Sequence, residues 1–273
     1  MPRARAFLPR GAQGERGMGI LKDMLKGAAD ALFGRKLTCA CCGAELFASE
    51  RFCPHCLQTL PFNAGSVCSK CGRAIAEEYP VCLECKGDMP LYDMARSAFR
   101  YEGEVVRMVK RFKTGGQWLA EPLAEQMLPL LRSAFAGADF LVHVPMTDAA
   151  RKRRGYDQAG LLADALASLS GMPHEAELLV KTRDTPSQKE LTRRERAENL
   201  LGSFRVHERA KCRGKIIVLV DDVLTTGATA SACARALRGA GAARVWVLTA
   251  ASVPARREEE KKRLNYAQIV KTP

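Results

Sequence analysis

The chain has 273 residues, of which 47% are hydrophobic, so it is long enough for one or two domains with a sizeable core. Its formal net charge of +13 favours an anionic partner such as phosphate, nucleic acid or an acidic membrane surface. No apolar run approaches the roughly 20 residues that span a bilayer, and the start lacks the hydrophobic centre of a secretory signal. We therefore expect no transmembrane segment and a cytoplasmic protein.

Residues 1–36 are predicted to form a basic N-terminal arm and a short amphipathic helix in the stretch GILKDMLKGAADALF. The first 17 residues have no periodicity and are interpreted either as a disordered arm or as a misassigned start. No functional assignment rests on them.

Four C-x-x-C pairs follow one another in residues 37–89, separated by 10, 11 and 10 residues. Two such pairs about a dozen residues apart supply the four thiolates of a tetrahedral zinc site. The eight predicted ligands are Cys39, Cys42, Cys53, Cys56, Cys68, Cys71, Cys82 and Cys85. The spacing predicts two structural Zn²⁺ ions in a small double zinc ribbon.

Two details of the zinc region remain open in the sequence. The repeated spacing favours sequential pairing of the knuckles, and cross-bracing is the alternative. Cys41 competes with Cys39 and Cys42 as a ligand, and C-x-x-C geometry favours the 39/42 pair. A disulfide framework is disfavoured because no secretion signal is present. His55 is expected to face solvent.

Residues 90–273 alternate between strand-like and helix-like runs and end in a basic tail. The clearest strands are FLVHVP at 140–145 and KIIVLV at 215–220, and a helix is predicted at 228–241. This order predicts an α/β fold with a mainly parallel sheet. His143, within the first of these strands, is interpreted as a packed residue.

The stretch VLVDDVLTTGAT, residues 218–229, carries the strongest functional signal. A buried strand leads into two carboxylates and then into hydroxyls around a glycine, just before the predicted helix. Hydroxyls and free N–H groups at a helix N-terminus suit a phosphate, and paired carboxylates accept hydrogen bonds from ribose hydroxyls. The predicted phosphate cradle comprises Thr225, Thr226, Gly227, Ala228 and Thr229, and the carboxylates are Asp221 and Asp222.

This stretch resembles the 5-phosphoribosyl-1-pyrophosphate (PRPP) motif of type I phosphoribosyltransferases. With RKRRGYDQAGLLADAL at 151–166, RDTPSQKELTRRERAENL at 183–200 and the cysteine pairs, the chain resembles the ComF family of competence-associated proteins over residues 37–252. The resemblance implies a zinc-ribbon region joined to a phosphoribosyltransferase-like domain that binds PRPP with Mg²⁺. It also implies single-stranded DNA and competence-machinery proteins as partners, with a location peripheral to the inner-membrane DNA-uptake machinery.

The run Arg151, Lys152, Arg153 and Arg154 follows the strand after which this superfamily places pyrophosphate. It is interpreted either as a contact to diphosphate or nucleic acid, or as a solvated basic helix start. Two functions stay open: a PRPP-binding protein that handles single-stranded DNA, and an active phosphoribosyltransferase with an unidentified acceptor. The sequence assigns no catalytic residue.

Overall fold

The computed structural model describes residues 38–255, apart from 48–49, 76–79, 184–199 and 201. The predicted N-terminal arm, most of the 183–200 stretch and the C-terminal tail therefore lie outside the described residues. The fold is built on a four-stranded, all-parallel sheet in the order β1-β6-β5-β2. Its strands are β1 (Met94–Arg100), β2 (Phe140–His143), β5 (Ile216–Leu224) and β6 (Arg244–Ser252).

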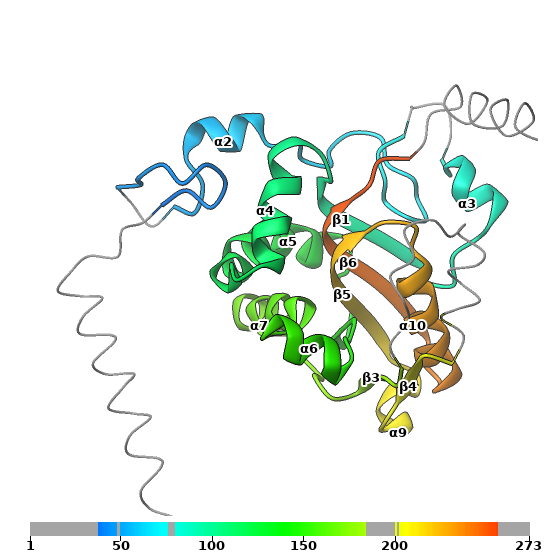
Figure 1. Cartoon of the computed structure of the whole chain (residues 1–273). Helices are drawn as coiled ribbons and strands as arrows, with labels where there is room; N and C mark the ends of the chain where they lie inside the picture. The colour runs from blue at the N-terminus through cyan, green and yellow to red at the C-terminus, as the bar shows by residue number, and fades with distance from the viewer. Residues whose placement is uncertain (1–37, 48–49, 76–79, 184–199, 201, 256–273) are drawn as a thin grey trace, which may run out of the picture.

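Hydrophobic side chains cover both faces of this sheet, because successive residues of a strand point to opposite sides. On β5, Val218 and Val220 belong to one buried cluster, while Ile217 and Leu219 belong to the other. The first cluster includes helices α4 (Gly103–Lys113), α5 (Ala120–Ser133) and α7 (Gln158–Ser170), and the second includes α10 (Ala228–Gly239). Figure 1 shows these helices around the sheet. The predicted α/β fold with a parallel sheet is confirmed.

The structure adds elements that the hydrophobic pattern did not predict. They are a short antiparallel pair, β3 (Leu179–Lys181) and β4 (Phe204–Val206), the helices α6 (Asp148–Arg154) and α9 (Arg209–Cys212), and the 3-10 turn η1 (Gln117–Leu119). Strand β5 also runs beyond its predicted end, because its pairing with β6 continues to Leu224 opposite Ser252. Asp221 and Asp222 therefore lie within the last residues of the strand and not after it.

The two halves of the zinc region lie against different faces of the sheet. Cys39 and Cys56, next to helix α2 (Pro54–Thr59), belong to the buried cluster of α4 and α5. The second group of cysteines, next to α3 (Leu83–Gly87), belongs to the cluster of α10. Figure 1 shows α2 near α4 and α3 on the other side of the molecule. Each of the two hydrophobic clusters contains residues from both sides of the predicted boundary between residues 89 and 90. That domain boundary stays a prediction.

Within the described ranges, no helix combines the length and apolar character needed to cross a membrane.

Candidate functional site

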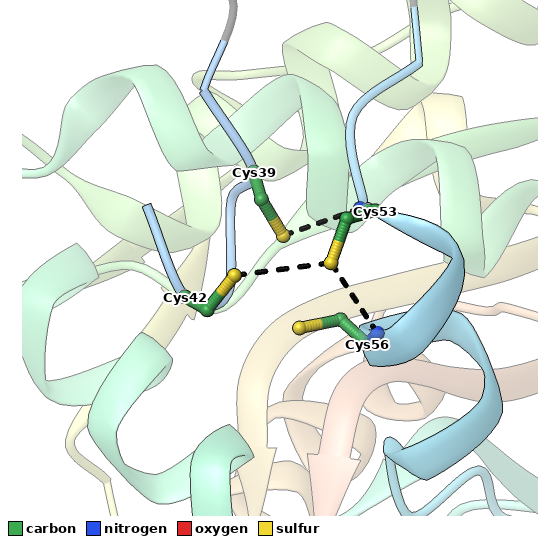
Figure 2. Close-up of side chains that lie close together, drawn as sticks. All are labelled: Cys39, Cys42, Cys53 and Cys56. Carbon is green, nitrogen blue, oxygen red and sulfur yellow. Dashed lines mark hydrogen bonds between the residues drawn. The ribbon is translucent and has the colours of Figure 1, made fainter. Parts of the chain in front are cut away.

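The eight predicted zinc ligands form two groups. The Sγ atoms of Cys39, Cys42, Cys53 and Cys56 all lie within 4.8 Å of one another, and those of Cys68, Cys71, Cys82 and Cys85 do the same. Figure 2 shows the first group, with the four side chains converging from two knuckles. The knuckles are thus paired sequentially, as the repeated spacing favours. Four thiolates at this separation suit a tetrahedral Zn²⁺ ion.

Backbone N–H groups point at the sulfur atoms of both groups. Cys53 N donates to Cys39 Sγ at 3.3 Å, and Cys82 N donates to Cys68 Sγ at the same distance. Burial raises the pKa of Cys39, but hydrogen bonds from the backbone of Cys42, Cys53 and Cys41 lower it to about 6. Such donors stabilise the thiolate, which is the form that binds metal.

The two competing ligands lie outside the clusters. Cys41 is buried, and this burial raises the pKa of its thiol, which disfavours the thiolate. His55 is exposed. The geometry therefore agrees with the 39/42 pair and with cysteine as the donor at each of the eight positions.

Arginine side chains attach the first cysteine group to the helices beside it. Arg111 on α4 donates to the carbonyls of Ala40 and Cys41 at 2.5 and 2.8 Å. Arg51 forms ion pairs with Glu121 and Glu125 of α5 at 2.6 and 3.1 Å. Arg111 thus connects the first ribbon to α4 and Arg51 connects it to α5. Lys113, the last residue of α4, lies beside the predicted PRPP carboxylates.

The loop between β5 and α10 has the form of an anion site. Gly227 is the N-cap of the 12-residue helix α10 and has a φ of 80°, a left-handed conformation that favours glycine. The helix has no side-chain cap and no acidic residue in its first turn. Thr226 Oγ1 accepts a hydrogen bond from Ala228 N at 3.3 Å. The helix dipole and these N–H groups favour negative charge here.

The two carboxylates have different environments. Asp222 Oδ2 lies 2.8 Å from Lys113 Nζ at the end of α4. Burial alone lowers the pKa of Lys113, but the charge and hydrogen bond of Asp222 outweigh it and the pKa is raised. Burial and the neighbouring Asp222 raise the pKa of Asp221, whose Oδ1 accepts a hydrogen bond from Asp222 N. Asp222 is therefore paired with a cation, whereas burial and the neighbouring charge disfavour the charged form of Asp221.

A pocket opens at the carboxyl ends of β2 and β5. It is lined by Lys113, Val144, Pro145, Met146, Arg154, Asp157, Gln158, Ala159, Lys181, Asp221, Asp222 and Thr229. Gln158 is buried, and its Oε1 accepts from Arg154 at 2.5 Å. Its Nε2 has no hydrogen-bond partner within the described part of the chain, which leaves one donor for a ligand.

The predicted basic run divides into two pairs. All four side chains are exposed on α6, but only Arg153 and Arg154 line the depression beside Lys113. Arg151 and Lys152 line neither this depression nor the pocket. Four successive residues complete one turn of a helix, so their side chains point in different directions and cannot all contact one ligand.

The predicted PRPP site left out three basic residues that lie beside it. Lys113 and Lys181 line the pocket, and the guanidinium of Arg73 donates to the Thr225 carbonyl. Each comes from a segment far from residues 221–229 in the chain, and none belongs to a recognisable local motif. Only the folded topology brings them together.

A chain of titratable groups runs behind the pocket. His143 Nε2 lies 3.7 Å from Asp157 Oδ2, and His143 Nδ1 lies 3.0 Å from His174 Nε2. His174 Nδ1 in turn lies 2.8 Å from Asp164 Oδ1. Burial lowers the pKa of His143, as expected for a packed histidine.

The site and fold define a class of protein that sequence comparison also identifies. Residues 81–272 match the model of the phosphoribosyl transferase domain, and residues 28–86 match that of the double zinc ribbon domain. The chain belongs to the phosphoribosyl transferase domain family and carries a double zinc ribbon. The match and the two cysteine clusters support structural zinc.

Within this class, the chain is a member of the ComF family. It is 31% identical over 191 residues to DNA utilization protein YhgH of Salmonella typhimurium, covering 67% of this chain and 83% of the relative. It is 26% identical to competence protein F of Haemophilus influenzae, covering 71% and 94%. Competence protein ComFC of Bacillus subtilis is 27% identical, with 76% and 91% covered.

Similar solved structures include TT1426 from Thermus thermophilus. Its identity to this chain is 18% and its TM-score is 0.33, with 53% of this chain and 79% of that chain covered.

Proposed function

We propose that this protein binds PRPP with Mg²⁺ at the carboxyl end of β5 and acts in DNA uptake by handling single-stranded DNA. One observation carries the first half. The pocket gathers the carboxylate pair at the end of β5, Thr229 in the first turn of α10, and the basic side chains of Lys113, Arg154 and Lys181; residues 225–228 precede Thr229 and do not line it. These are the groups that ribose hydroxyls, a phosphate and a diphosphate each require.

In this proposal each group of the pocket holds one part of PRPP. The 5-phosphate binds residues 225–229, and the ribose hydroxyls donate to Asp221 and Asp222. The diphosphate lies toward Lys113, Arg153 and Arg154, which line the neighbouring depression. In this arrangement Lys113 exchanges its ion pair with Asp222 for a contact to the ligand.

The donor set around the pocket also fits Mg²⁺. Asp221 and Asp222 offer carboxylate oxygens, which are the hard ligands this ion prefers, and the diphosphate would supply others; both oxygens of Asp157 already accept backbone hydrogen bonds. When bound, Mg²⁺ neutralises part of the diphosphate charge. The residues of the chain then position the ribose and the 5-phosphate.

Calorimetry with PRPP and Mg²⁺ tests this assignment. The double variant Asp221→Asn, Asp222→Asn keeps the side-chain size and removes the charge, so binding should weaken by at least ~1–3 kcal/mol. The matched control is Asp139→Asn, which removes a carboxylate just before β2 that pairs with Lys215 at 2.7 Å. Equal affinities in the double variant and the control would remove the ribose role from the pair.

Family relationship and charge support the second half of the proposal. The ComF-family relatives are called DNA utilization and competence proteins, and the chain carries a net charge of +13. Aromatic stacking platforms are few among the described residues. Phe52 and Tyr156 are buried and Phe62 packs against Phe99, whereas Phe47 and Trp118 are exposed. Phosphate contacts should therefore dominate, with little sequence preference.

Variants in the two halves of the basic run should distinguish DNA binding from PRPP binding. We expect the quadruple change of Arg151, Lys152, Arg153 and Arg154 to Ala to weaken binding to an oligonucleotide of about 30 bases and to flatten its salt slope, by roughly 0.7 for each phosphate that the variant no longer neutralises. Changing Arg151 and Lys152 alone should weaken DNA binding and spare PRPP. Changing Arg153 and Arg154 should weaken both. Absence of binding by the wild-type protein at low salt would refute the DNA half.

Phosphoribosyl transfer is the second candidate function, favoured by the same PRPP pocket. Incubation with PRPP, Mg²⁺ and a panel of nucleobases, followed by assay of pyrophosphate, distinguishes the two. Release that depends on a base identifies an enzyme, whereas binding without release identifies PRPP as a ligand. Contact with competence-machinery proteins beside the membrane belongs to the DNA-handling proposal.

A further inference from the structure

We infer that the second zinc ribbon is part of the phosphate site, and that Arg73 is the residue through which it positions the 5-phosphate loop. The inference rests on the proposed PRPP site for its ligand. Its geometric basis is a set of contacts between residues 68–92 and residues 225–231, which are far apart in the chain.

Arg73 lies between the cysteine cluster and the loop. Its side chain is buried, and Nη2 donates a hydrogen bond to the carbonyl of Thr225. Nη1 lies 3.9 Å from Oε1 of Glu84, which sits between Cys82 and Cys85. Burial of a guanidinium is costly, and the contacts to Thr225 and Glu84 offset part of that cost, while Nε has no hydrogen-bond partner among the described residues.

The hydrogen bond fixes the direction of one peptide group in the loop. In a trans peptide, the carbonyl of one residue and the N–H of the next point in opposite directions. With the Thr225 carbonyl held toward Arg73, the N–H of Thr226 points away from it. Donors of an anion cradle are effective only when their directions are set before the ligand arrives.

The knuckle that carries Arg73 is itself anchored. Cys68 N donates to the Arg73 carbonyl at 2.8 Å, and Ala95 N on β1 donates to the Lys70 carbonyl at 2.8 Å. Gly72, with a φ of 67°, lies so close to β1 that an added Cβ would fall 2.2 Å from the Ala95 carbonyl oxygen. The arginine therefore starts from a fixed point on the central sheet.

Two further contacts connect the same segment to the loop and helix. The hydroxyl of Tyr92, a buried residue just before β1, lies 3.0 Å from where a Cβ of Gly227 would stand. Leu91 N donates to Ser231 Oγ in the first turn of α10 at 3.3 Å. Hydrogen bonds from this segment thus reach the loop at Thr225 and the first turn of α10 at Ser231, and Tyr92 lies beside Gly227.

The position of Arg73 relative to Glu84 depends on the zinc ion, because the two residues belong to different knuckles. Residues 68–73 form one, and residues 82–85 form the other. A zinc ion bound by Cys68, Cys71, Cys82 and Cys85 joins the two and supplies much of the folding free energy of so small a module. Zinc at this cluster then keeps the guanidinium between Glu84 and Thr225.

The test compares Arg73→Met and Arg73→Lys with Arg51→Met, the matched arginine of the first ribbon. We expect all three to keep the wild-type zinc content. Arg73→Met should weaken PRPP–Mg²⁺ binding about tenfold, the scale of one hydrogen bond from a charged donor. Arg73→Lys, which retains one donor, should restore part of the affinity, and Arg51→Met should leave it unchanged. Unchanged affinity in Arg73→Met would overturn the inference.

Hydrogen exchange separates this inference from the proposed function. Without any ligand, Arg73→Met should speed exchange at the amides of residues 226–229, and Arg51→Met should not. If the wild-type protein fails to bind PRPP, the proposed function is wrong, and the exchange result alone then decides the positioning role. Equal exchange in both variants would reject it.

A second comparison tests whether the metal acts through Arg73. Cys82→Ser should lower zinc content and weaken PRPP binding. The same change in the Arg73→Met background should weaken binding little further, because the connection is already broken. Additive effects on affinity would show that the ribbon acts by another route and would overturn the role assigned to the metal.

Discussion

Gly227 allows a direct test of how the phosphate loop is packed. Its φ of 80° is a conformation that residues with a Cβ rarely adopt, and an added Cβ would lie 3.0 Å from the Tyr92 hydroxyl. The next nearest atoms, Cε1 and Cζ of the Tyr92 ring, would lie at 3.6 and 3.8 Å, which are ordinary contacts. Gly227→Ala therefore combines a conformational cost with a steric cost that comes from one oxygen atom.

The two costs have separate magnitudes. Placing a non-glycine residue in the left-handed region costs about 1–2 kcal/mol. Crowding a buried side chain by one methyl group adds about 1–3 kcal/mol. We expect Gly227→Ala to lower the free energy of unfolding by about 2–5 kcal/mol. Tyr92→Phe removes the crowded oxygen, so Gly227→Ala should be less costly by the steric part when made in that background.

Chemical denaturation followed by the fluorescence of Trp246, which is buried on β6, measures these differences. Gly171→Ala is the matched control, because Gly171 has a φ of 75° and an added Cβ would meet nothing within 4 Å. It should show the conformational cost alone. This packing is refuted if Gly227→Ala is no more destabilising than Gly171→Ala, or if Tyr92→Phe leaves its effect unchanged.

Two further predictions concern metal and pH. Purified protein should contain two Zn²⁺ per chain, and Cys53→Ser should remove one and loosen residues 38–60 while the sheet keeps its exchange protection; metal analysis that finds one equivalent or none in the wild type contradicts this. Burial lowers the pKa of His143 in the folded state, so the unfolded state binds more protons below about pH 6.5, the ordinary histidine value. Stability should therefore fall as the pH drops from about 7 to about 5.5, and the decline should be shallower in His143→Asn; equal pH slopes in both proteins would exclude His143 as the cause.

The parts of the candidate sites that the sequence predicts are those whose residues lie within one short segment. Residues 221–229 carry a strand end, a loop and a helix start in consecutive positions, and the cysteine spacing encodes each knuckle. Side chains from distant segments leave no such local pattern. Arg73 and Thr225 are 152 residues apart, and the pairing of Lys113 with Asp222 depends on where α4 ends beside the sheet.

The predicted end of strand β5 is wrong for a related reason. The hydrophobic pattern of KIIVLV stops at the first carboxylate. Because charged residues are usually exposed, this pattern predicts that the strand ends there. The backbone of β5 nevertheless continues to pair with β6 as far as Leu224, which hydrophobic patterning does not register. The short pair β3–β4 has too few residues to show a period at all.

The two zinc ribbons belong to the hydrophobic clusters on opposite faces of the sheet, and each connects to the proposed PRPP site through a different element. The first contacts Arg111 on α4, two residues before Lys113. The end of that helix is tied to the α6–α7 junction, because Tyr156 donates to the Phe112 carbonyl and accepts from Gly115 N. The second reaches Thr225 through Arg73. Loss of zinc from the first ribbon should therefore be transmitted through Arg111 to the cations proposed for the diphosphate, whereas Arg51 pairs with α5 and is not part of that connection. A change in the second ribbon should be transmitted to the 5-phosphate cradle.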